Sequence, residues 1–162
     1  MAVEIERKFL VTGDAWRAEV SGARQIRQAY LSKSGKASVR VRVVDESSAR
    51  LTVKAAPDGK GPALSRAEFE YPIPVEEALE MLELRSGRIV EKTRHLVPAE
   101  NGRTWEVDVF EGAHTGLVLA EIELGTADEQ VVLPAWLGRE VTGDPAYSNA
   151  ALARENGAPS QA

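Results

Sequence analysis

Three charged side chains near the start of the chain, Glu4, Glu6 and Lys8, are spaced two residues apart. In an extended strand, successive side chains point to opposite faces, so these three share one face while Ile5 and Phe9 share the other. Carboxylates and an amine on one face could hold a divalent cation and an anionic ligand. The same alternation is also typical of an ordinary sheet strand whose polar face meets water, so this segment alone leaves both interpretations open.

The pattern recurs along the chain, where at least six later segments look extended and also place charges two residues apart. The cations on these faces are Lys8, Arg40, Arg42, Lys54, Arg66, Lys92 and Arg94. The anions are Glu4, Glu6, Glu68, Glu70, Glu106, Asp108, Glu121 and Glu123. If these faces point inward, the space they enclose must be hydrated or hold an ionic ligand, because unpaired buried charge is too costly.

The elements that must position these charges are mostly strands. Strands are predicted over residues 3–10, 23–31, 37–45, 50–55, 65–73, 88–97, 104–110 and 117–124. Helices are predicted over 15–20, 74–87, 127–137 and 144–157. Residues 56–64, rich in proline and glycine, are predicted to form a mobile loop, and Asn101-Gly102 a hairpin turn.

Eight antiparallel-looking strands with few helices between them predict an α+β fold, with the sheet closed or nearly closed into a barrel. A chain of 162 residues fits one domain. We therefore expect a single domain over residues 1–157, followed by a disordered tail over 158–162.

Composition excludes several other classes of protein. The net charge of −5 argues against a broad nucleic-acid-binding surface, and the absence of cysteine excludes disulfides and thiolate metal sites. No apolar run approaches the roughly 20 residues of a membrane span, and the first residues do not resemble a secretory signal. We expect a cytoplasmic protein without membrane or nucleic-acid partners.

The segment Glu4-Ile5-Glu6-Arg7-Lys8 resembles the Glu-x-Glu-x-Lys signature of the CYTH domain, the family of triphosphate tunnel metalloenzymes. The resemblance extends in order along nearly the whole chain, through Arg40-x-Arg42, Lys54, Arg66-x-Glu68-x-Glu70, Lys92-x-Arg94, Asp108 and Glu121-x-Glu123. It implies a closed eight-stranded antiparallel tunnel with the charges inside, most similar to short bacterial inorganic triphosphatases. Because family members are often dimers, the resemblance also allows a homodimer.

The resemblance implies a role for each charged group, and the chemistry of the groups agrees. A triphosphate would be held by Lys8, Arg40, Arg42, Lys54, Lys92 and Arg94. Mg²⁺ or Mn²⁺ would be held by Glu4, Glu6, Glu121 and Glu123, which are hard oxygen ligands. Supporting acids in the tunnel would be Glu68, Glu70 and Asp108.

The group that activates water is harder to assign. In related enzymes a lysine paired with a tyrosine has this role, and Lys8 and Tyr30 match those positions. Among many cations Lys8 is expected to have a lowered pKa, as a general base requires. The alternative is that Lys8 only binds phosphate and Tyr30 only packs. The two histidines are poor candidates for this role, because His95 lies out of phase with the charged face and His114 falls in a loop.

The sequence therefore predicts metal-dependent hydrolysis of inorganic triphosphate to pyrophosphate and phosphate. The alternatives on the same fold are a class IV adenylate cyclase and a thiamine or nucleoside triphosphatase. No base-recognition pocket is evident, which disfavours these nucleotide substrates. A non-catalytic polyphosphate-binding module is a further alternative, although a pure anion binder would not need carboxylates in its tunnel.

Overall fold

The computed structural model describes residues 2–33, 35–56 and 65–153. Its strands are β1 (Ala2–Val11), β2 (Gly22–Ser32), β3 (Ala37–Val44), β4 (Ser48–Ala55), β5 (Ser65–Ile73), β6 (Ser86–Pro98), β7 (Thr104–Phe110), β8 (Val118–Glu123) and β9 (Leu137–Glu140). The α-helices are α1 (Val75–Leu82) and α2 (Asn149–Leu152). Short 3-10 helices are η1 (Ala15–Glu19), η2 (Glu100–Gly102), η3 (Gly112–His114) and η4 (Pro145–Tyr147).

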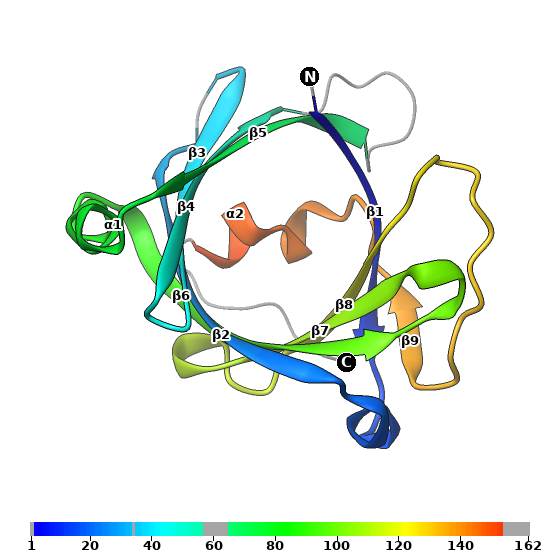
Figure 1. Ribbon diagram of the computed structural model, residues 1–162. Helices are drawn as coiled ribbons and strands as arrows, with labels where there is room; N and C mark the ends of the chain where they lie inside the picture. The colour runs from blue at the N-terminus through cyan, green and yellow to red at the C-terminus, as the bar shows by residue number, and fades with distance from the viewer. Residues whose placement is uncertain (1, 34, 57–64, 154–162) are drawn as a thin grey trace.

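The strands pair in the order β5-β4-β3-β2-β6-β7-β8-β1, and β5 also pairs with β1 (Figure 1). This last pairing closes eight strands into a ring, so the predicted antiparallel barrel is confirmed. The short strand β9 is an addition, which pairs with the C-terminal half of β1. Among the helices of the described ranges, none is long and apolar enough to cross a membrane.

Strand register brings the predicted charged positions together on the inner face. Lys8 lies opposite Glu121, and Arg94 lies opposite Asp108. Residues directly opposite one another on neighbouring strands point to the same side of the sheet. The alternating apolar residues therefore face outward, where two clusters bury them.

Helix α1 covers one outer face of the barrel. Its residues Ala78 and Leu82 are buried against Ala29, Val41 and Val43 of β2 and β3. The helix is shorter than predicted, because β6 already begins at Ser86. The other outer cluster includes Trp16 of η1, Trp105 and Trp136.

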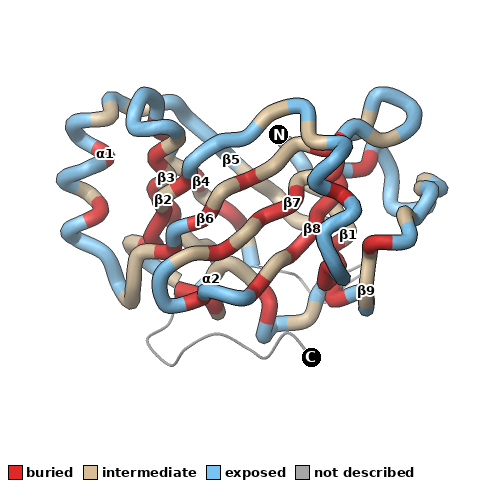
Figure 2. Tube along the Cα trace, turned by 90° about the horizontal axis from the view of Figure 1, so that it is seen from below, coloured by how far each residue is buried: buried red, intermediate tan, exposed pale blue. Residues whose placement is uncertain are grey.

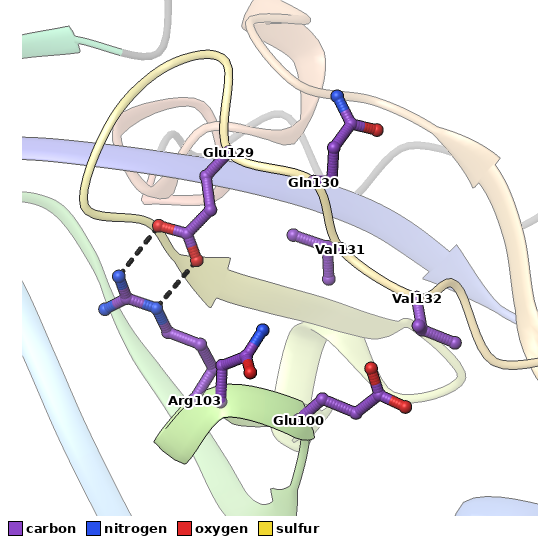
Figure 3. Close-up of a pocket in the computed structure, with 7 residues that line it drawn as sticks. Glu100, Arg103, Glu129, Gln130, Val131 and Val132 are labelled. Atoms are coloured by element: carbon purple, nitrogen blue, oxygen red, sulfur yellow. Dashed lines mark hydrogen bonds and ion pairs between the residues drawn. The ribbon is translucent and has the colours of Figure 1, made fainter.

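The helix predicted over 127–137 is wrong: the chain forms a loop there and then enters β9. Arg103 donates two hydrogen bonds to the carboxylate of Glu129, at 2.9 and 2.7 Å, and so fixes the loop to the β6–β7 hairpin (Figure 3). Pro134 has no N–H for a helix. The backbone carbonyl of Trp136 instead accepts a hydrogen bond from the N–H of Thr12.

The helix predicted over 144–157 is also different: its described part is split into η4 and α2, with an extended Ser148 between them. Both pieces lie across one end of the barrel (Figures 1 and 2). Together with inward residues of the strands they form an apolar cluster, here called the apolar floor. It consists of Leu10, Tyr30, Val90, Phe110, Leu117, Leu119, Val141, Tyr147, Leu152 and Ala153. The predicted loop over 57–64 and the predicted tail lie outside the described residues.

We predict that Leu152→Ala destabilises the protein by about 2–5 kcal/mol, because Leu152 is 0% exposed at the centre of the apolar floor. Urea denaturation of both proteins would measure the difference in the free energy of unfolding. Leu84→Ala is the matched control, since Leu84 is 73% exposed and its truncation should change that free energy by less than roughly 0.5 kcal/mol. Equal effects of the two substitutions would contradict the packing described here.

Candidate active site

A polar cavity of about 200 Å³ lies inside the barrel, and we call it the charged cavity. Its described lining consists of Glu4, Glu6, Arg40, Arg42, Lys54, Glu68, Glu70, Arg94, Glu106, Glu121, Glu123 and Asn149. Four cations and seven carboxylates give this lining a formal charge of −3. Side chains from the inner faces of seven strands therefore line this cavity, as the alternation of side chains with a period of two predicted.

The strands hold Arg40 and Arg42 by neutral partners. Arg42 donates from Nε to the side-chain oxygen of Gln28 at 2.7 Å, and Arg40 donates to Thr52 Oγ1 at 3.5 Å. The Nε of Arg40 is buried and has no hydrogen-bond partner in the described part of the chain. Burial, followed by the nearby charges of Arg40 and Arg94, lowers the pKa of Arg42 to about 9. In the described part of the chain neither arginine pairs with a carboxylate, so their guanidinium groups could bind an anion.

Three carboxylates meet on the opposite side of the cavity. The Glu6 carboxyl is hydrogen-bonded to those of Glu4 and Glu121, and burial together with these two neighbours raises its pKa to about 10. Glu4 is also 2.7 Å from the Nζ of Lys54. A divalent cation would relieve the repulsion among these groups, and carboxylate oxygens are the ligands that Mg²⁺ and Mn²⁺ prefer.

The described residues contain no group of three or more carboxylates and histidines preassembled as a metal cage. Glu4, Glu6 and Glu121 offer carboxylate oxygens, which Mg²⁺ binds in ones or twos while water and phosphate oxygens complete its coordination. Glu123, the fourth predicted ligand, is exposed and also lines the charged cavity.

A buried ion-pair chain lies behind the cavity wall. Asp108 accepts from Nε and Nη2 of Arg94 at 2.8 and 2.9 Å, and its Oδ2 is 2.7 Å from Lys92 Nζ. Lys92 is 0% exposed, and it is absent from the cavity's described lining. Burial lowers the pKa of Lys92 to about 7, although Asp108 opposes this shift. In this arrangement Lys92 and Asp108 fix the position of Arg94, which does reach the cavity.

Lys8 and Tyr30 lie deeper, at the boundary between the charged cavity and the apolar floor. Lys8 Nζ donates to the carbonyl of Tyr147 at 3.1 Å and is 3.5 Å from Glu121. Although burial works in the opposite direction, Glu121 and other nearby carboxylates raise the pKa of Lys8, so the expected lowering is wrong. Tyr30 is buried in the apolar floor and has no hydrogen bond to Lys8 among the described residues.

Residues 2–153 match the family model of the CYTH domain. The chain belongs to the CYTH domain family. An inorganic triphosphatase of Acetivibrio thermocellus is 46% identical to this CYTH domain over 155 residues, which cover 95% of each chain. An inorganic triphosphatase of Nitrosomonas europaea is 35% identical over 152 residues, which cover 93% of this chain and 96% of the relative.

A crystal structure of an inorganic triphosphatase has the same fold as this CYTH domain. The two superpose with a TM-score of 0.65 at 33% identity, over 94% of this chain and 95% of the other. The predicted membership of the CYTH family is therefore confirmed, together with the barrel.

The structure brings most of the predicted site residues of this CYTH domain to the charged cavity. Four predicted residues are absent from its described lining: Lys92 and Asp108 lie behind the wall, and Lys8 and Tyr30 lie toward the apolar floor. Sequence reasoning missed Asn149, which reaches the cavity from α2. No strand periodicity could reveal Asn149, because its position depends on how the C-terminal segment enters the barrel. Glu106 was counted on a charged face but was not assigned to the site.

We predict that Asp108→Asn lowers the free energy of unfolding by roughly 3–5 kcal/mol, because it leaves Lys92 buried without a counter-charge. The double variant Asp108→Asn/Lys92→Met removes that amine and should be more stable than Asp108→Asn alone. Guanidinium denaturation would measure both differences. As a control, Glu46→Gln breaks an exposed pair with Arg27 and should cost less than about 1 kcal/mol. A double variant no more stable than the single one would refute the buried pair.

Proposed function

We propose that this CYTH domain hydrolyses inorganic triphosphate to pyrophosphate and orthophosphate with the help of a divalent cation. The observation that carries the proposal is the composition of the charged cavity, which brings together clustered carboxylates and two arginines, Arg40 and Arg42, that have only neutral partners among the described residues. The two relatives described above are both inorganic triphosphatases, which supports the same reaction for this chain.

The formal charge of −3 on the cavity lining supports the requirement for a metal. A triphosphate carries several negative charges of its own, so this lining would repel it without added positive charge. We propose that Glu4, Glu6 and Glu121, with Glu123 beside them, hold Mg²⁺ or Mn²⁺. Such an ion, when bound, would polarise a phosphoryl oxygen and neutralise charge that develops in the transition state.

The cations of the cavity have distinct tasks in this proposal. Arg40 and Arg42 bind phosphate oxygens through their planar donors, because no carboxylate in the described part of the chain occupies them. Arg94 reaches the same cavity from a fixed position, since Asp108 holds two of its nitrogens. Lys54 pairs with Glu4, and both line the cavity, so Lys54 would contact both the metal ligand and the substrate.

The cavity lining favours inorganic triphosphate over the alternatives that share the fold. Every described lining residue is charged except Asn149, so there is no apolar or aromatic surface against which a purine or thiazolium ring could stack. The carboxylates disfavour a non-catalytic polyphosphate binder, because without a metal they would oppose binding of an anion.

We propose that Lys8 acts as a fixed cation and that Tyr30 packs in the apolar floor. The raised pKa of Lys8 keeps it protonated near neutral pH, and a protonated amine does not accept a proton from water. Its contacts to Glu121 and to the Tyr147 carbonyl orient it beneath the proposed metal ligands. The Lys8–Tyr30 pair as a general base remains the alternative.

The proposed reaction is tested by measuring phosphate release from tripolyphosphate, ATP and thiamine triphosphate with Mg²⁺, with Mn²⁺ and with EDTA. We expect tripolyphosphate to be the best substrate and EDTA to abolish turnover. Glu6→Gln keeps the side-chain shape and should lower kcat/KM by about 10–100-fold or more. Glu46→Gln, on an exposed turn, is the matched control. Absence of release from tripolyphosphate, or formation of cyclic AMP from ATP as the faster reaction, would contradict the proposal.

Kinetics of Tyr30→Phe distinguish the two roles of the Lys8–Tyr30 pair. If Tyr30 only packs, loss of its hydroxyl should change kcat by less than about tenfold, whereas loss of general-base chemistry costs about 10²–10⁴-fold. Lys8→Met should lower kcat/KM because it removes a cation beside Glu121. A drop of 10²-fold or more in Tyr30→Phe, with no further loss in the double variant, would instead support the general-base pair.

A further inference from the structure

Two strands of the described residues, β5 and β9, pair with the same edge of β1 at different positions. Strand β5 pairs with residues 2–5 of β1, and β9 pairs with the edge between Phe9 and Val11. At Lys8, the segment that follows β9 forms the hydrogen bonds to this edge. Val141 donates its N–H to the Lys8 carbonyl at 2.8 Å, and Thr142 Oγ1 accepts from the Lys8 N–H at 2.9 Å. Around Glu6, the described residues leave this edge of the barrel wall without a strand partner.

A second cavity of about 240 Å³ lies at this seam, and we call it the lateral pocket. Its described lining consists of Glu6, Lys8, Arg66 and residues of the segment 141–149. Glu6 and Asn149 also line the charged cavity, so the two cavities are neighbours separated by shared side chains. The lateral pocket has room for a small ion with its water.

Arg66 is the feature of the lateral pocket that requires an explanation. It lies opposite Glu4 in the β1–β5 pair, so its side chain is on the inner face of the sheet. Each of the other six cations predicted on the charged faces has a hydrogen bond or ion pair. Arg66 has neither with any residue that the structure describes, although it is half-buried. A sheltered guanidinium without a partner is a donor set for an oxyanion.

The other polar groups of the pocket agree with an anionic ligand. The side chain of Asn149 lines it as a neutral group that can donate. The carboxylate of Asp144 is already engaged, since its Oδ1 accepts from the N–H of Ala146 at 3.0 Å and Arg139 lies 4.0 Å from its Oδ2. Glu6, itself a proposed metal ligand, belongs to the wall that the lateral pocket shares with the charged cavity.

We propose that the lateral pocket is a subsite for a single phosphate group, with Arg66 as its charged ligand and Asn149 as a neutral one. The anion subsite itself follows from these contacts, and its identification with phosphate rests on the proposed function. The phosphate group is either the orthophosphate product, displaced sideways from the charged cavity, or the terminal phosphate of the bound substrate.

Calorimetric titration with inorganic phosphate tests the subsite without any need for turnover. The protein is first saturated with Mg²⁺ and pyrophosphate, so that the charged cavity is occupied. We expect orthophosphate still to bind wild type, and Arg66→Ala to raise its Kd by about tenfold or more, with partial recovery in Arg66→Lys. Arg27→Ala removes an arginine of β2 that pairs with Glu46 and should leave this Kd unchanged. Failure of orthophosphate to bind beside pyrophosphate, or an unchanged Kd in Arg66→Ala, would overturn the subsite.

Steady-state kinetics with tripolyphosphate then identify the source of the phosphate group. If the pocket holds the product, Arg66→Ala should weaken inhibition by orthophosphate while KM stays unchanged. If it holds the terminal phosphate of the substrate, KM should rise as well. An Arg66→Ala enzyme with unaltered inhibition and unaltered KM would refute both roles. A wild-type protein that does not hydrolyse tripolyphosphate would refute the proposed reaction, and the calorimetric result on the anion subsite would still stand.

Discussion

The free-energy cost of removing charged side chains from water is the main constraint on this structure. A closed barrel that turns its charged faces inward removes them from bulk water, and each ionised group then needs a partner, a ligand or hydration. Strand register supplies partners for some groups: Lys54 meets Glu4, while Lys92 and Arg94 share Asp108. It supplies only neutral partners to Arg40 and Arg42. The groups that the protein leaves incompletely paired are therefore those able to bind ionic ligands.

The apolar floor bounds the charged cavity at one end of the barrel, because α2 and η4 bring apolar side chains to that end. Lys8 lies where the two regions meet, and a backbone carbonyl and Glu121 hold its amine. Electrostatic interactions are stronger beside such an apolar layer than in open water. The same C-terminal segment that closes the barrel thus strengthens the field acting on any bound anion.

Prediction from the sequence succeeded where the signal was local and periodic. Alternation with a period of two placed Glu4, Arg42 and Glu121 on one inner surface, since a strand can turn its side chains only two ways. It failed for 127–137, where the chain forms a loop that is held by the Arg103–Glu129 ion pair and by a hydrogen bond to β1-adjacent Thr12. It also missed Asn149, because entry of the C-terminal segment into the barrel depends on contacts distant in sequence.

Barrel closure also explains why a ninth strand is present. Strands in a closed barrel are tilted, and the stagger between the first and last strands leaves part of an edge uncovered. Among the described residues, β5 pairs with residues 2–5 of β1, and β9 pairs farther along the same edge. The chain then continues from β9 along Lys8 and into the end of the barrel. One segment thus completes the wall, fills the end of the barrel and carries Asn149 to the charged cavity.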